Sequence, residues 1–515
     1  MKKLIILAVL GLIANLNLYS QSYSLKLVTE SSLGKIPRNS EIVVEEIIRH
    51  ATADESGEKL IIEYLASCKY EDVYYTYELR DIKKSCKIVH FIDNKDNFWL
   101  SEIIFNKDLI NALRKYGPQT DLRDESSDDA QEYINKVTDA NLVFDDPLLK
   151  NYLYTLLHKI RMTNNVFYKN GNINVVVLKS TDLNASIYPD GTLLITTGLL
   201  ANLNSEAELA GVLAHEVAHY VLDHSIVNIN KMNQRIKRAE FWAAFATGMA
   251  AVAEGVLATQ SNYYYPVGAG TMATAAIASS IANSVIERLG MEYNQEQETE
   301  ADRIAVNILK LLKYNENGFA TALSNLQSYQ QTNGNYSYFF NSSTHPSLLS
   351  RISASGKVEE IKDLFYKQQT SFAISNYAVV EFSRRNFQAA YKFAKQNIDN
   401  NVADDDDYTI CSASLQIIKD TPESNKEAME LLNKAYLINP NNINISKFKC
   451  ILHLRLKESD KAKEELNNYM SGISEEIKRL DNIKGQNTWE NSYSYLTQEN
   501  SWAVKMAIKL NGMHQ

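Results

Sequence analysis

The chain has 515 residues and a formal net charge of −9, and its composition is 45% hydrophobic and 22% charged. These proportions are ordinary for a globular protein, and the length predicts three or four domains. The acidic balance argues against a nucleic-acid partner, because binding to phosphates requires a basic surface.

Residues 1–20 have the pattern of a secretory signal peptide. Lys2 and Lys3 supply the positive start, an apolar run follows at residues 4–13, and cleavage is predicted after Ser20. The alternative is a membrane anchor, but a spanning helix needs about 20 apolar residues. We therefore expect an exported protein.

The four cysteines are Cys68, Cys86, Cys411 and Cys450. Export permits disulfides, so one interpretation joins Cys68 to Cys86 and Cys411 to Cys450. Buried free thiols are the alternative. No C-x-x-C pair occurs, which argues against a metal site made of cysteines.

Residues 21–125 are predicted to form a β-containing N-terminal domain of unknown role. Runs rich in Val, Ile, Tyr and Phe predict strands at residues 41–48, 73–79, 87–92 and 98–105. The polar and acidic run at residues 121–130 then marks a linker.

Residues 131–365 are predicted to form a second domain that mixes helices and strands. Helical spacing of leucines predicts a helix at 147–161, and strands are predicted at 173–178 and 193–196. A further helix is expected from Ser205 to about His224. Ser205 and Glu208 have the spacing of a capping box at its start.

Residues 239–288 are rich in alanine and weakly apolar. Two transmembrane helices are one interpretation, but Glu240, Glu254 and the many small residues weaken it, because alanine contributes little to membrane insertion. We favour a helical hairpin that packs beside the active site or touches the membrane peripherally.

Residues 370–515 are predicted to be helical repeats. Three similar segments align on Ala389, Ala428 and Ala462, at spacings of 39 and 34 residues. The second spacing equals the tetratricopeptide period, and Pro440 lies where such a repeat ends. The alternative is an ordinary helical bundle.

The run His215-Glu216-Val217-Ala218-His219 matches the pattern H-E-x-x-H. Residues four apart on a helix lie one turn above each other, so the two imidazoles can face one zinc ion. Glu216 then lies beside the metal, where it can act as the general base. The alternative is that these histidines only pack or cap, which would leave buried polar groups to be satisfied.

A third ligand is expected in the acidic run at residues 296–303. Glu298 and Asp302 are four apart and share one helix face, which favours Glu298 as the ligand and Asp302 as the acceptor for a histidine N–H. Glu296 and Glu300 form a rival pair. His224 lies about 140° round the helix from His219, which argues against a place on the metal face.

The runs HEVAHYVLDH and EQETEADR together resemble the gluzincin family of the CAAX prenyl protease and HtpX. The runs NASIYPDGTLLITTGLL and Thr344-His345-Pro346, the latter with Arg351, have the same resemblance. With a signal peptide and repeats, the chain is most similar to the periplasmic, BepA-like members. This resemblance implies a protein of the periplasm that can associate with the outer membrane. The resemblance covers about residues 140–360. It implies an α+β, mainly α fold: a zincin-type metallopeptidase domain with a small sheet, followed by tetratricopeptide-like repeats.

The resemblance also implies site roles. Glu298 would complete the zinc site with His215 and His219, at one zinc ion per chain. His345 and Arg351 would stabilise the oxyanion, and His345 can also block the metal at rest. Asn184 and Ala185 would bind substrate as an edge strand.

The sequence therefore predicts an exported zinc metalloendopeptidase, with Glu216 activating water at a metal-polarised peptide bond. Expected substrates are misfolded or unassembled envelope proteins, and the repeats would recruit protein partners. The alternative from another class is a non-proteolytic chaperone or adaptor with a structural zinc site. A structural site needs no base, so Glu216 argues against that alternative.

Overall fold

The computed structural model describes residues 25–53, 60–88, 95–105, 142–161, 173–181, 183–225, 293–333, 348–481 and 489–512, with single residues between 128 and 138. The predicted signal peptide, the alanine-rich segment 239–288 and His345 lie outside the described residues, as does most of the predicted linker. The chain divides into two compact units. The first is mainly Met1–Arg123, with His158–Asn172 and Val221–Asp223, and the second is the remainder.

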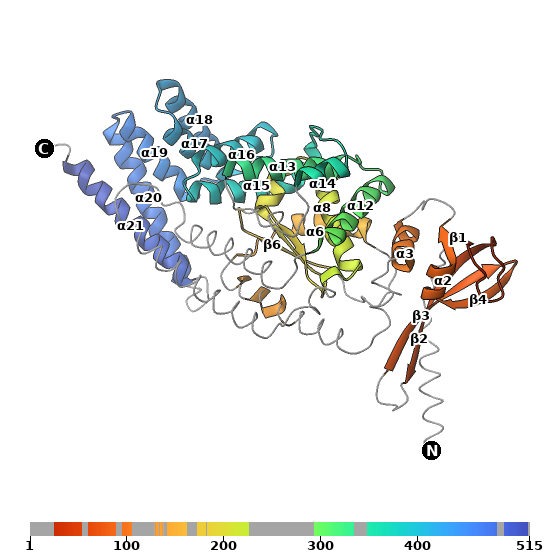
Figure 1. Ribbon diagram of the computed structural model, residues 1–515. Helices are drawn as coiled ribbons and strands as arrows, with labels where there is room; N and C mark the ends of the chain where they lie inside the picture. Colours follow the sequence, from red (N-terminus) through yellow and green to blue (C-terminus); the bar gives the residue numbers. More distant parts are fainter. Residues whose placement is uncertain are drawn as a thin grey trace, which may run out of the picture. The chain divides into compact units, whose positions relative to one another are not determined.

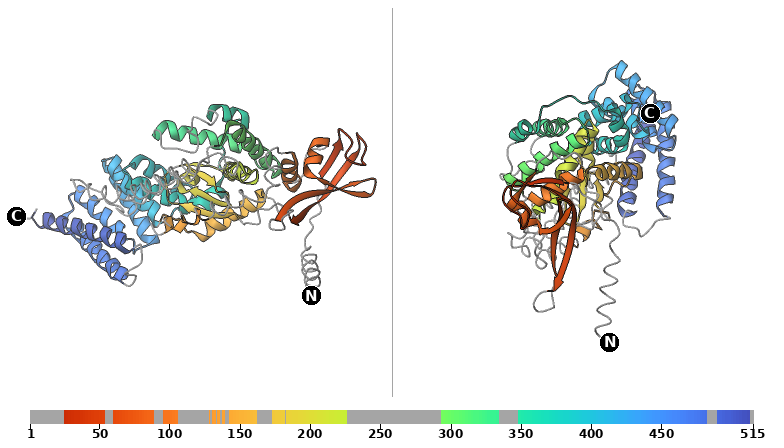
Figure 2. Two further views of the ribbon diagram at one scale, coloured as in Figure 1. Left: turned by 60° about the horizontal axis from the view of Figure 1, so that its bottom comes forward. Right: turned by 90° about the vertical axis from the view of Figure 1, so that its right-hand side faces the viewer.

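The first unit contains a five-stranded antiparallel sheet in the order β4-β3-β2-β1-β5. Its strands and helices are β1 Leu25–Thr29, β2 Glu41–Ala53, β3 Leu60–Tyr70, β4 Val73–Glu78, α2 Leu79–Ser85, β5 Cys86–Ile88 and α3 Lys95–Phe105 (Figures 1 and 2). Alternate residues of β1 are buried, among them Leu25 and Leu27, as expected for a strand with one face on a core. The role of this unit stays unknown.

The strand predicted at residues 98–105 is wrong, because this segment belongs to helix α3. Phe98, Ser101 and Ile104 are buried at intervals of three, and the neighbours Trp99 and Leu100 are both buried. A strand would bury alternate residues instead. The indole N–H of Trp99 also donates to the carbonyl of Ile160 at 3.0 Å. Composition suggested a strand, and the spacing of the buried side chains explains the helix.

The second unit contains a small mixed sheet in the order β6-β8-β7. Strand β6 (Asn174–Leu178) runs parallel to β8 (Thr192–Thr196), and β7 (Ala185–Ile187) runs antiparallel to β8. Every residue of β8 is buried, as expected for the central strand. Both strands predicted in this region are therefore present, at nearly the predicted bounds.

Helices precede and follow the strands of this sheet along the chain. They are α6 Pro147–Ile160, α7 Thr197–Asn202, α8 Glu206–Val221, α12 Gln295–Leu311, α13 Gly318–Asn333 and α14 Leu348–Ser355. The short helix α7 begins at the end of β8, where the side chain of Thr196 caps it by accepting from the Leu199 N–H at 3.2 Å. Because β8, α7 and α8 follow each other almost without a loop, the small sheet places helix α8 directly.

A series of helices follows to the end of the described chain: α15 Leu364–Ser383, α16 Phe387–Asp399, α17 Asp405–Ile418, α18 Pro422–Ile438, α19 Ile443–Arg455, α20 Ser459–Asp481 and α21 Trp489–Gly512. Consecutive helices contact one another, and α17 also contacts both α15 and α19 (Figure 1). Ala428 and Ala462 are fully buried, and Ala390 takes the buried place beside Ala389. A mainly α fold with a small sheet is confirmed. The tetratricopeptide assignment stays a prediction.

Helix α15 lies across the predicted boundary between peptidase domain and repeats, and it packs on α7. The Tyr366 hydroxyl donates to the carbonyl of Leu200 at 2.6 Å, and the Lys367 ammonium donates to the carbonyl of Leu203 at 2.7 Å. Burial lowers the pKa of Lys367 to about 8. At the other end of α15, Arg384 donates to the hydroxyl of Thr181. The helical series and the small sheet thus share one compact unit.

All four cysteines are buried free thiols, so neither expected disulfide is present. Cys68 is on β3 and Cys86 on β5, with β2 and β1 between them in the sheet. Cys411 and Cys450 belong to two separate apolar clusters of the helical series. Burial raises the pKa of Cys68 and of Cys411 to about 12, which keeps these thiols protonated and unreactive.

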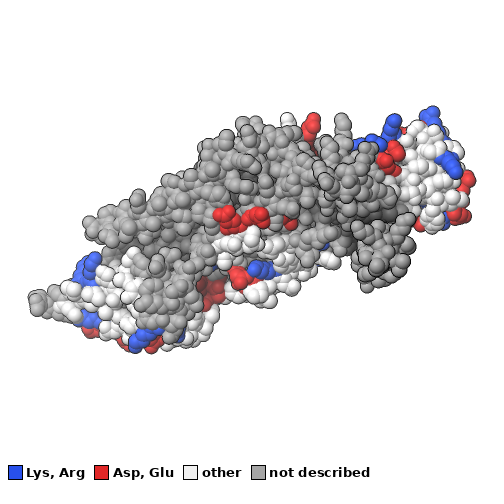
Figure 3. Space-filling model, turned by 90° about the horizontal axis from the view of Figure 1, so that it is seen from below, with Lys and Arg blue, Asp and Glu red and all other residues white. Residues whose placement is uncertain are grey.

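On the face drawn in Figure 3, basic and acidic side chains of the described residues are interspersed, and no broad basic surface is seen among them. This agrees with the acidic composition. Among the described helices, none is both long enough and apolar enough to span a membrane.

Candidate metal centre

Helix α8 carries the two histidines of the H-E-x-x-H run. Its first turn is closed by Glu208, which accepts from the Ser205 hydroxyl at 3.2 Å and from the Asn204 N–H at 3.0 Å. The Ser205 hydroxyl oxygen in turn accepts from the Glu208 N–H at 3.2 Å. The predicted capping pair therefore exists, but the returning bond reaches Asn204 instead of Ser205.

A close approach between α8 and α13 fixes the position of His215. A side chain at Gly211 would bring its Cβ to 2.8 Å from the Cβ of Phe319, so only glycine allows this packing. The Phe319 ring then stacks on the imidazole of His215, with ring centroids 5.5 Å apart. A glycine one turn before the histidine thus positions a ligand.

Helix α12 brings the acidic residues to α8. It begins with a capping box in which Asn294 and Gln297 satisfy each other's backbone N–H groups. Glu298 and Asp302, one turn apart, are both buried. The face predicted for these two residues is therefore the one that packs inward.

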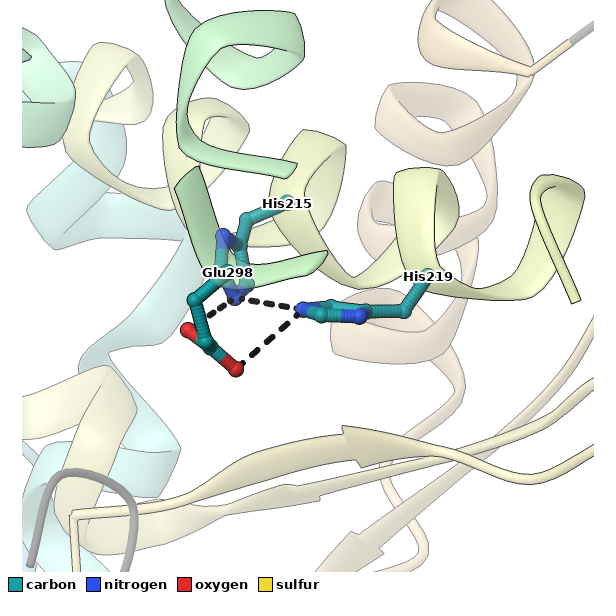
Figure 4. Close-up of side chains that lie close together, drawn as sticks. All are labelled: His215, His219 and Glu298. Atoms are coloured by element: carbon teal, nitrogen blue, oxygen red, sulfur yellow. Dashed lines mark hydrogen bonds and ion pairs between the residues drawn. The ribbon is translucent and has the colours of Figure 1, made fainter. Parts of the chain in front are cut away.

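His215, His219 and Glu298 converge, with one ligand atom of each lying within 4.8 Å of the others (Figure 4). The two Nε2 atoms are 3.0 Å apart. The Glu298 oxygens lie 3.6 Å from His215 Nε2 and 3.5 Å from His219 Nε2. Ligand atoms of a tetrahedral zinc ion are about 3.3 Å apart, given bonds of about 2.0–2.1 Å. Two imidazoles and a carboxylate at these separations fit zinc.

Asp302 and Arg351 lie behind these three residues. Asp302 Oδ1 lies 2.9 Å from His215 Nδ1, and both carboxylate oxygens of Asp302 accept from the Arg351 guanidinium, at 2.6 and 2.8 Å. Burial alone would raise the pKa of Asp302, but Arg351 and His215 outweigh it and hold that pKa below its usual value. Asp302 is thus an anion beside His215 Nδ1.

Glu216 is buried next to the cluster, with 3% of its surface exposed. Burial, together with the negative charge of Glu298, raises the pKa of Glu216 well above its usual value. The backbone N–H of Ile187 and the charge of Arg351 oppose this shift. A carboxylate of raised pKa is a stronger base, and a bound dication would counter part of the shift.

Comparison with known families adds an independent observation. Residues 148–358 match the model of Peptidase family M48. This segment is an M48 peptidase domain. The match begins in α6, ends just after α14, and contains all the described residues of the metal centre.

Several known proteins are similar to this chain, among them the following three. The beta-barrel assembly-enhancing protease of Escherichia coli strain K12 is 25% identical over 195 residues, which is 38% of this chain and 36% of the relative. The mitochondrial metalloendopeptidase OMA1 of Schizosaccharomyces pombe is 25% identical over 233 residues, 44% of this chain and 59% of the relative. The metalloendopeptidase OMA1 of Bos taurus is 41% identical over 49 residues, 10% of this chain and 9% of the relative.

The family match and the names of these relatives agree with a peptidase domain at residues 148–358. The chain spans about a third of the length of the Escherichia coli relative.

Strand β7 is an edge strand of the small sheet, with β8 on one side of it. Asn184 and Tyr188 bond to β8 through their main chains, so the main-chain groups of Ala185 and Ile187 point to the other side. One of these, the N–H of Ile187, reaches Glu216. The buried Oδ1 of Asn184 has no hydrogen-bond partner among the described residues. The predicted roles of Asn184 and Ala185 in substrate binding stay predictions.

The predicted oxyanion residues stay predictions. Arg351 is buried, and its three guanidinium nitrogens already contact Asp302 and Glu298, the latter at 3.1 Å. His345 lies outside the described residues. Of the rival acidic pair, Glu296 is exposed, as expected for a solvated residue.

Sequence reasoning did not predict that His224 and Glu300 lie beside the metal centre. Helix α8 ends at Val221, and Asp223 has a left-handed φ of 57°, so the chain turns back and His224 does not continue the helix. His224 Nδ1 lies 2.9 Å from His219 Nδ1, and His224 Nε2 lies 3.3 Å from Glu300. The helical projection assumed that α8 continues for three more residues, as far as His224. Sequence reasoning did not anticipate that α8 ends at Val221, before His224.

Proposed function

We propose that this protein is an exported zinc metalloendopeptidase that cleaves polypeptides in envelope protein quality control. The observation that carries the proposal is the buried convergence of His215, His219 and Glu298, with Glu216 beside them. A structural zinc site has four protein ligands and no adjacent base. Among the described residues three such groups converge, and a buried carboxylate of raised pKa lies next to them.

In the proposed hydrolysis of a peptide bond, the metal and the side chains of the protein have different roles. When bound, zinc supplies a Lewis acid that polarises a carbonyl and lowers the pKa of a water molecule. His215 and His219 would hold it through Nε2, and Glu298 through its carboxylate. Glu216 would take the proton of the attacking water on its carboxylate and return it to the leaving amine.

Substrate would bind as an extra strand on the side of β7 that faces away from β8. Added strands gain affinity from main-chain hydrogen bonds, which suits an enzyme that accepts many sequences. Ala185 lies two residues from Ile187, whose N–H contacts Glu216. A peptide paired with Ala185 would therefore pass close to the base. We propose oxyanion stabilisation by His345 and Arg351 as a further part of this mechanism.

The biological part of the proposal rests on sequence features and on one relative. The pattern of residues 1–20 supports export to the periplasm, and the Escherichia coli relative is called a beta-barrel assembly-enhancing protease. We propose that misfolded or unassembled envelope proteins are the substrates. The helices from α15 to α21 would recruit partners as tetratricopeptide-like repeats. Residues 239–288 would provide peripheral membrane contact.

Cleavage of unfolded casein tests the enzymatic part. Wild-type protein should cleave casein, a zinc chelator should stop the cleavage, and added zinc should restore it. Glu216→Gln should lower the rate about 10²–10⁴-fold, which is the usual contribution of a general base. Glu296→Gln, at an exposed position of α12, is the matched control and should cleave like the wild type.

A Glu216→Gln protein that cleaves at the wild-type rate would contradict the proposed mechanism. The chaperone alternative makes a different prediction. In that case, neither protein cleaves casein, and both suppress its aggregation equally well.

A further inference from the structure

His224 is a buried histidine that the proposed mechanism does not use. It lies three residues after the end of α8, with 3% of its surface exposed. Its Nδ1 is 2.9 Å from Nδ1 of His219, and the two rings are inclined at 71°. The contact is thus made by the edge of His219 that faces away from Glu298.

Glu300 of α12 contacts the other ring nitrogen of His224. Its Oε2 lies 3.3 Å from Nε2 of His224. The side chain of Gln297 reaches the backbone carbonyl of His224 at 3.5 Å, which ties the turn after α8 to α12. Both nitrogens of the His224 ring therefore have a polar neighbour, one from each helix of the metal centre.

Only one arrangement of protons fits these contacts with neutral rings and His219 as a ligand. A metal on Nε2 of His219 requires the proton on Nδ1. That N–H can donate only to an unprotonated Nδ1 of His224. The proton of His224 must then be on Nε2, where Glu300 can accept it. Each donor in the series meets an acceptor.

His215 also has a carboxylate at its Nδ1, without a second histidine in between. Asp302 contacts Nδ1 of His215 directly, at 2.9 Å. At His219 the imidazole of His224 lies between the ligand and the carboxylate of Glu300. Tyr293 also stacks on the His219 ring with centroids 3.6 Å apart, which restrains the plane of the ring.

We propose that His224 and Glu300 are positioning residues that fix the tautomer and direction of His219, so that Nε2 faces the metal. This inference rests on the proposed metal site. Neither residue touches the metal, and their effect passes through His219. Partners of ligand N–H groups typically contribute 10–100-fold to metal affinity.

The test is zinc affinity, measured by competition with a chromophoric chelator on purified, folded protein. His224→Phe keeps the ring and removes both nitrogens, and it should weaken zinc binding 10–100-fold. His224→Gln keeps an acceptor and a donor and should recover part of the affinity. His158→Phe, at an exposed histidine, is the control and should bind like the wild type.

A double-mutant cycle tests whether Glu300 acts through His224, an arrangement called the relay below, or whether the two residues affect packing independently. Glu300→Ala should weaken zinc binding less than His224→Phe does, and the double variant should bind no more weakly than His224→Phe alone. Additive losses would overturn the relay. Glu300 is only partly buried, so Glu300→Ala decides the question if His224→Phe does not fold. Wild-type affinity in Glu300→Ala would then overturn the relay.

Glu298→Ala distinguishes the two levels of inference. If it binds zinc as tightly as the wild type, the proposed metal site itself fails. If Glu298→Ala loses zinc while His224→Phe keeps wild-type affinity, the metal site stands and only the relay is wrong.

Discussion

The guanidinium of Arg351 balances the charges of two buried carboxylates. It bonds to both oxygens of Asp302 and lies 3.1 Å from Glu298. Two buried anions without a cation would be costly, because an unpaired charge loses its hydration without compensation. At the scale of single residues, the metal centre therefore depends on an arginine from α14 as much as on the H-E-x-x-H helix.

Replacing Arg351 by Met should destabilise the zinc-free protein by about 3–5 kcal/mol, since it breaks a buried ion pair from one side. Urea unfolding measures this change. Arg479→Met on α20, where the arginine side chain is 66% exposed, is the control and should change stability by less than about 0.5 kcal/mol. Equal stabilities of the two variants would contradict the role given to Arg351.

Much of the candidate site could be predicted from the residues alone. The spacing of His215 and His219, and of Glu298 and Asp302, follows from the helical repeat, which is a local property. His224 could not be placed, because a left-handed turn at Asp223 follows the end of α8 and the helical spacing of the sequence does not show it. Contacts between distant segments, such as that of Arg351 with Asp302, have no local signature either.

At the scale of elements, Asp363 joins two helix starts. One of its oxygens caps α15 by accepting from the Tyr366 N–H at 3.0 Å, and the other accepts from the Glu206 N–H of α8 at 3.0 Å. The first turns of both helices therefore share one carboxylate. Because α8 carries His215 and His219, the start of the C-terminal helices helps to hold the metal helix.

Asp363→Ala should lower the free energy of unfolding by about 1–2 kcal/mol, since it removes two helix caps. Asp363→Asn keeps one capping oxygen and should lose about half as much. Urea unfolding of the three proteins gives the comparison. If the alanine and asparagine variants are equally stable, the shared cap is not the source of the effect.

Asp407 makes the stability of the helical series depend on pH. It is buried at the start of α17, where it accepts from Asn397 at 3.0 Å and from the Asp404 N–H at 3.2 Å. Burial, and then the charge of Asp404, raise the pKa of Asp407 well above its usual value. The folded protein therefore holds this proton more tightly than the unfolded chain does.

An acid whose pKa is raised on folding stabilises the fold at low pH, and this contribution is lost as pH rises through the folded pKa. Asp407→Asn cannot lose a proton, so its stability relative to the wild type should grow as pH rises from about 4 to about 7. Urea unfolding across this range measures the difference. Asp460→Asn, at an exposed position of α20, is the control, and a constant difference between Asp407→Asn and the wild type would refute the assignment.

At the scale of the whole molecule, the M48 domain and the helices that follow it share a core. Ala201 of α7 belongs to the apolar cluster of α15 to α19, and Tyr366 and Lys367 bond to the carbonyls of Leu200 and Leu203. A sequence boundary near residue 365 marks a change of repeat pattern. It does not mark a break in packing, because α15 covers α7.

A protease site inserted between Glu360 and Lys362, whose side chains are 81% and 86% exposed, should be cut without separating the two pieces. The fragments should elute together in gel filtration under native conditions and separate in urea. Fragments that separate without denaturant would contradict the shared core.

The zinc content of purified protein, measured by atomic emission, tests the metal site most directly. The wild type and Glu296→Gln should each contain one zinc ion per chain, and Glu298→Ala should contain far less after dialysis against a weak chelator. If Glu298→Ala retains a full zinc ion under the same dialysis, His215, His219 and Glu298 do not form the site described here.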